Sequence, residues 1–200
     1  MLSRGDNDLT MGFDLELLEA LNRVAVESVA AGRLPAEDVL PGVRALDLWS
    51  EGPNGAMLLW VDRGAHGLGE PELHDVIVTR VDGTWRLMGG ASSTMEPWDE
   101  LLASFPPGLH RVGGSSASQR PLGPVFVTWA IATPEVALVR LRDADGEVRE
   151  RLPGRHGFVV FGVTSEDPLT SVYAVNGAGE EFPGQPLTLW APPRDTAINA

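Results

Sequence analysis

Residues 124–182 constrain the fold most, because short runs rich in β-branched and aromatic residues follow one another at close intervals. These runs cover 124–133, 135–143, 158–164 and 171–176. Turn-forming residues separate them at 143–146, 153–157 and 176–179. Several short strands with turns between them are typical of an antiparallel β-sandwich. The second half of the chain is therefore expected to be all β.

Within this half we expect strands at 125–132, 135–142, 146–152, 157–164 and 170–176, with shorter pieces near 180–182 and 187–190. A hairpin at Asp145-Gly146, a strand that begins Gly157-Phe158 and a late strand that ends in the turn 176–179 resemble small bacterial immunoglobulin-like or prealbumin-like β-sandwich modules. This resemblance of residues 124–182 implies an immunoglobulin-like sandwich that binds or spaces other domains. It carries over no functional residue.

The first half is expected to begin with a long helix from Leu15 to about Ala31. Its apolar residues recur with a period near 3.6, at Leu17, Leu18, Leu21, Val24, Ala25, Ser28 and Val29. Asp14 is placed to cap the start, and Gly32 is placed to end the helix. One face of this helix should therefore pack on a core.

Four strands should follow the helix. They are expected at 43–49, 56–61, 74–81 and 84–88. Asp82-Gly83 is a strong signal for a tight hairpin between the last two. A helix ahead of such a meander predicts an α+β domain, with the long helix packed on a four-stranded antiparallel sheet. This rhythm is similar to that of cystatin-like or NTF2-like domains.

The composition then changes. A short second helix is expected over 95–104, and the segment that follows is rich in Gly, Ser and Pro with little to bury. We therefore predict an α+β domain at 13–105, a linker at 106–123, a β-sandwich domain at 124–190 and a tail at 191–200.

Charge and composition limit the classes of partner. The formal net charge is −13, with 28 acids against 15 bases, and every base is Arg. An acidic chain is not expected to bind nucleic acid, whereas a basic protein partner or a cation is compatible with it. No apolar run approaches the roughly 18 residues that a membrane span needs, and the polar start does not resemble a signal peptide. We expect a cytoplasmic protein of bacterial type, and the oligomeric state is left open.

The densest polar cluster lies between the second and third predicted strands. Asp62, His66, His74 and Asp75 occur there, together with Glu70 and Glu72. Such nitrogen and oxygen ligands suit Zn²⁺, Mn²⁺ or Fe²⁺, so a divalent metal is the one cofactor that the sequence suggests. The spacing matches no known metal motif, and a solvated acidic loop explains the cluster equally well.

Three tryptophans occur on neighbouring predicted strands. Trp49, Trp60 and Trp85 could line one concave face that binds an apolar ligand or a sugar. The alternative is that they fill the core between helix and sheet.

Two functional hypotheses follow. No nucleophile elbow or phosphate loop is present, and no Cys is available as a nucleophile or metal ligand. We therefore favour a non-enzymatic binding or protein-interaction protein. The alternative is a small-molecule binder or metal-dependent enzyme that uses a pocket in the first domain.

Overall fold

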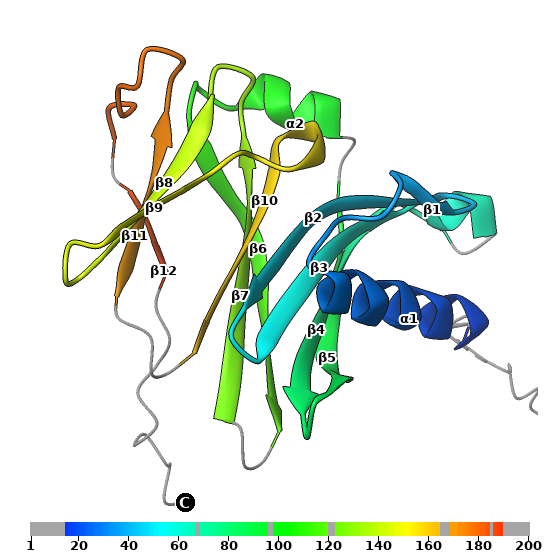
Figure 1. The fold of residues 1–200 in the computed structure, drawn as a ribbon. Coiled ribbons are helices and arrows are strands. Elements are labelled where there is room, and N and C mark those ends of the chain that lie inside the picture. Colours follow the sequence, from blue (N-terminus) through cyan, green and yellow to red (C-terminus); the bar gives the residue numbers. More distant parts are fainter. Residues whose placement is uncertain are drawn as a thin grey trace, which may run out of the picture.

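The computed structural model describes residues 15–66, 69–95, 98–119, 123–164, 169–184 and 186–189. The described chain is mostly β and contains three antiparallel sheets (Figure 1). Sheet A has the strand order β1-β2-β3-β4-β5, sheet B the order β10-β7-β6, and sheet C the order β12-β11-β8-β9. No helix among these residues is long and apolar enough to cross a membrane.

Sheet A follows the long helix α1, Leu15–Ala31, which has the predicted bounds. Its strands are β1 (Asp38–Leu40), β2 (Val43–Glu51), β3 (Asn54–Val61), β4 (Glu72–Val81) and β5 (Thr84–Thr94). A short 3-10 helix, η1 (Arg63–His66), connects β3 to β4. The predicted hairpin at Asp82-Gly83 joins β4 to β5, and both turn residues have positive φ angles, 51° and 80°.

Sheets B and C are built from the rest of the chain. A short helix, α2 (Trp98–Ser104), leads into β6 (Leu109–Gln119) and β7 (Gly123–Ala132), which pair with each other in sheet B. Sheet C contains β8 (Leu138–Asp143), β9 (Val148–Arg151), β11 (Thr170–Val175) and β12 (Leu187–Leu189). Between β9 and β11 the chain returns to sheet B through η2 (Arg155–Gly157) and β10 (Phe158–Thr164).

The elements form four layers, in the order α1, sheet A, sheet B and sheet C (Figure 1). Successive side chains of a strand point to opposite faces, so sheet A contributes side chains to two cores. Met57 and Leu59 of β3 pack toward α1, whereas Leu58 packs toward sheet B. Sheet B is likewise covered on both faces. Its Val127 faces sheet A, and its Ala130 faces sheet C.

The predicted fold class is wrong. The helix packs on a five-stranded sheet instead of a four-stranded one, because β1 adds an edge strand. The second half is also not a separate immunoglobulin-like sandwich, since sheet B packs on sheet A as well as on sheet C. The predicted tail at 191–200 lies outside the described residues.

Most of the segment predicted as a linker, 106–123, is strand β6. Its glycines serve close packing, not flexibility. A Cβ atom at Gly113 would lie 2.3 Å from Nε1 of Trp129, so only glycine lets this indole lie against β6. Low apolar content was therefore a poor guide here, because small residues leave room for a large ring from the neighbouring strand.

Two buried aspartates connect sheets A and B, one at each side. On one side, Asp47 of β2 accepts the Val160 N–H of β10 at 2.6 Å. On the other, Asp75 of β4 accepts the Ala91 N–H at 3.0 Å and the hydroxyl of Ser115 of β6. A β-bulge precedes Asp47 in β2, and it re-aims the strand at this point. The Asp47 carboxylate thus binds a backbone N–H at the edge of β10, and the Asp75 carboxylate binds a side-chain hydroxyl of β6.

Candidate functional site

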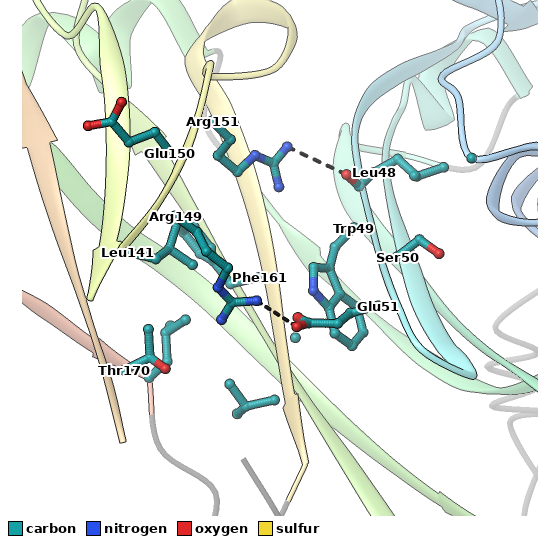
Figure 2. A pocket seen from close by; sticks show the side chains of 14 residues that line it. Leu48, Trp49, Ser50, Glu51, Leu141, Arg149, Glu150, Arg151, Phe161 and Thr170 are labelled. Atoms are coloured by element: carbon teal, nitrogen blue, oxygen red, sulfur yellow. Dashed lines mark hydrogen bonds and ion pairs between the residues drawn. The ribbon is translucent and has the colours of Figure 1, made fainter. Parts of the chain in front are cut away.

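A groove of about 600 Å³ lies between sheets A and C (Figure 2). One wall is the second half of β2, residues 48–51, and the other comes from β8 and β9. Strand β10 of sheet B forms the floor with residues 161–163. We call this space the A–C groove. It forms where segments about 100 residues apart in the sequence face each other.

Trp49 is the largest side chain of the groove. Its indole lies on the backbone of β10, and a Cβ atom at Gly162 would come within 2.2 Å of the ring. The glycine is therefore required for this placement. Trp49 is partly buried and projects from β2 into the groove (Figure 2). An aromatic face held in this way is a rigid apolar contact for a ligand.

An ion pair spans the groove beside Trp49. Nη1 of Arg149 lies 2.5 Å from Oε1 of Glu51, and both side chains are about half exposed, at 46% and 52% (Figure 2). Exposed ion pairs contribute about 0–1 kcal/mol to stability. A ligand can therefore replace one partner at little cost to the fold.

A second, deeper ion pair fixes the width of the groove. Nη2 of Arg151 lies 2.6 Å and 2.7 Å from the two carboxylate oxygens of Asp47, while its Nη1 donates to the Val160 carbonyl at 2.9 Å. Burial raises the pKa of Asp47 to about 6, although Arg151 and the Val160 N–H both favour the charged form. These contacts tie β9 to β2 through the edge of β10.

The outer face of sheet C holds β9 from the other side. Arg140 of β8 donates to Glu150 at 2.8 Å and to Glu181 at 3.0 Å. Arg142 donates to the same Glu181 oxygen at 2.9 Å. The side chain of Glu150 is thus engaged on one face of β9, while Arg149 and Arg151 face the groove. The wall is fixed on both faces.

The predicted metal ligands are distributed over several places. Asp62 accepts the Ala65 N–H at 3.2 Å and stabilises η1. The side chain of His66 lies outside the described part of the structure. His74 and Asp75 are successive residues of β4 and therefore point to opposite faces of sheet A. No group of three or more His, Asp or Glu side chains is placed to hold a metal ion among the described residues, and the metal site stays a prediction.

Burial shifts the pKa values of two of the predicted metal ligands, Asp75 and His74. Burial raises the pKa of Asp75 to about 6, partly opposed by the hydrogen bonds from Ser115 and Ala91. Burial also lowers the pKa of His74, and nearby Glu72 opposes this effect. Nδ1 of His74 has no hydrogen-bond partner within the described part of the chain. Because burial lowers its pKa, His74 is expected to be neutral at pH 7.

The three predicted tryptophans do not line one cavity. Trp49 and Trp60 pack at the core between sheets A and B, whereas Trp85 packs at the core beneath α1. The guanidinium of Arg44 lies 5.4 Å from the ring centre of Trp60. Of the three, Trp49 alone lines the A–C groove. The space between α1 and sheet A is filled by buried aliphatic side chains.

Sequence reasoning missed the partners of Trp49. Glu51 lies between the predicted strands 43–49 and 56–61, and Arg149 and Gly162 lie in predicted strands of the other half of the chain. No local pattern connects these positions. The alternation of Arg149 and Arg151 on β9 is the one signal that could have placed two cations on the same face.

The described lining of the groove suits binding. It contains no His, and its hydroxyls come from Ser50 and Thr170. Apolar side chains of Leu48, Trp49, Leu141, Phe161, Val163 and Leu189 lie beside the charged rim. Comparisons of the chain with protein families, curated proteins and solved structures give no significant match. A function is therefore inferred from the geometry of the groove and not from a relative.

Proposed function

We propose that the protein is a non-enzymatic binding protein that holds its ligand in the A–C groove. The observation that carries this proposal is the combination of a fixed aromatic side chain, Trp49, with a replaceable ion pair in one open space. Its volume, about 600 Å³, lies within the range of roughly 300–1,000 Å³ that ligand sites occupy.

The geometry supports binding without a large rearrangement. Trp49 is held flat on Gly162, and the wall opposite is tied back by Arg151 and Asp47. A ligand gains affinity from such a site because little side-chain freedom is lost on binding. Only the exposed pair of Glu51 and Arg149 has to change partners.

A fluorine NMR screen tests the proposal. The protein is labelled with 5-fluorotryptophan, and the Trp49 resonance is assigned with the Trp49→Phe variant. A fragment library of short peptides, sugars and aromatic acids is then added. Hits should shift the Trp49 resonance in a saturable way and leave Trp85 unchanged, because Trp85 lies on the helix side of sheet A.

The Trp85 resonance serves as the internal control. Hits that shift Trp85 and leave Trp49 unchanged would place the ligand on the helix side of sheet A and refute binding in the groove. A library that shifts no resonance at all would refute the proposal that the groove binds ligands.

A further inference from the structure

We propose that the ligand of the A–C groove is an extended, basic segment of a partner protein, which adds as a strand along the free edge of β9. Its cationic side chain would lie on Trp49 and pair with Glu51. This inference rests on the proposed function and names the class of ligand.

The groove lies between two strand edges. β9 is an edge strand of sheet C and pairs only with β8 among the described strands. In β2, the partner strand β1 reaches only Val43 and Arg44, so the part that walls the groove has no strand on its outer side within the described chain. Unpaired backbone N–H and C=O groups on such edges are a template for an added strand.

The charges of β9 do not block its edge. Charged side chains often protect edge strands from pairing. Here Arg149 and Glu150 point to opposite faces of sheet C, and each has a partner, Glu51 and Arg140 respectively. Their charges are therefore held above and below the strand, and the backbone edge between them stays open.

The net charge of the whole chain favours a basic segment as the ligand. The chain carries a formal charge of −13, so it attracts cationic partners over long range. Within the groove, Glu51 and Trp49 are two positions apart on β2 and project to the same side. A carboxylate beside an aromatic face suits Lys or Arg, which gain both an ion pair and a cation–π contact.

In the free protein, Arg149 already occupies the position that such a cation would take beside Glu51. The model of binding is therefore competition between Arg149 and the ligand cation for one carboxylate. It makes two predictions of opposite sign. Removing Arg149 should strengthen binding, and neutralising Glu51 should weaken it.

The test selects binders from a displayed library of random linear peptides and measures affinities of the enriched peptides. These peptides should be rich in Lys or Arg. Their affinity should fall about two- to fivefold in Glu51→Gln and rise by a similar factor in Arg149→Ala, the range expected for an exposed ion pair. Glu19→Gln and Arg23→Ala, which change the same charges on the exposed side of α1, should have little effect.

Backbone pairing has its own readout. N-methylation of alternate peptide residues should weaken binding about fivefold for each lost hydrogen bond, and methylation of the residues between them should not. Groove-binding peptides that are acidic, or that ignore N-methylation, would overturn this inference and leave the proposed function standing. No enriched peptide, with fragment hits of another class at Trp49, would also overturn it. The absence of both peptides and fragment hits would refute the proposed function itself.

Discussion

Replacing Asp75 with Asn should make the protein more stable at neutral pH. Asp75 is fully buried between sheets A and B and has no cationic partner among its described contacts. Burial raises the pKa of its carboxyl from 3.8 to about 6. An asparagine has the same shape, and it can accept the Ala91 N–H and donate to the Ser115 hydroxyl oxygen. The substitution therefore removes a buried charge and keeps the hydrogen bonds.

The sign and size follow from proton linkage. Because the folded pKa is higher than the unfolded one, the folded protein binds the proton more tightly between pH 4 and 6. The stability that Asp75 contributes is present below about pH 4 and is lost as the pH rises through about 6. The full difference amounts to about 3 kcal/mol, since one pKa unit is about 1.4 kcal/mol. About 2 kcal/mol of this loss falls between pH 4.5 and 7.

Urea unfolding at a series of pH values measures the effect. The quantity of interest is the unfolding free energy of Asp75→Asn minus that of the wild type. It should grow by about 2 kcal/mol from pH 4.5 to 7. Asp47 cancels from the difference because both proteins retain it. Asp145→Asn, the same change on an exposed turn, should show a pH-independent difference within about 0.5 kcal/mol. A flat difference for Asp75→Asn would refute the argument from burial.

Three further predictions concern the groove. Gly162→Ala should displace the Trp49 indole and cost about 1–3 kcal/mol, with a red shift of tryptophan emission; an unchanged spectrum would contradict the contact. Asp47→Ala should cost about 3 kcal/mol in urea unfolding, because it leaves Arg151 and the Val160 N–H without their acceptor; a cost below about 1 kcal/mol would contradict a structural role. Glu51→Gln should change stability by less than about 1 kcal/mol, and a larger loss would mean that its ion pair supports the fold.

The sequence predicted the elements whose signals are local. The helix α1 was predicted with its observed bounds, because its apolar period and Gly32 are both properties of one short stretch. The hairpin at Asp82-Gly83 was predicted for the same reason. Strand β6 was missed, since its Gly and Ser residues have low strand propensity and are explained only by the Trp129 ring that packs against them.

The layer order could not be predicted from these elements. A strand of a separate two-layer sandwich buries one face, whereas β7 buries Val127 on one face and Ala130 on the other. The apolar residues on both faces of β7 indicate that both are covered, but they do not identify the sheets that cover them. The deciding contacts are polar and distant in sequence, such as that of Asp47 with Val160, and no local pattern identifies them.

The candidate site exists for the same reason that the fold prediction was wrong: sheet B packs on sheet A as well as on sheet C. Had the second half been an independent sandwich, the face of β10 that carries Gly162 would be exposed to solvent, and Trp49 would belong to another domain. Because sheet B is shared, β10 contacts β2, and Trp49 gains a floor that its own half of the chain does not provide. Glu51 and Arg149 meet for the same reason. The groove is thus a property of the junction between the two halves, and a part of the chain that contained only one half would lack it.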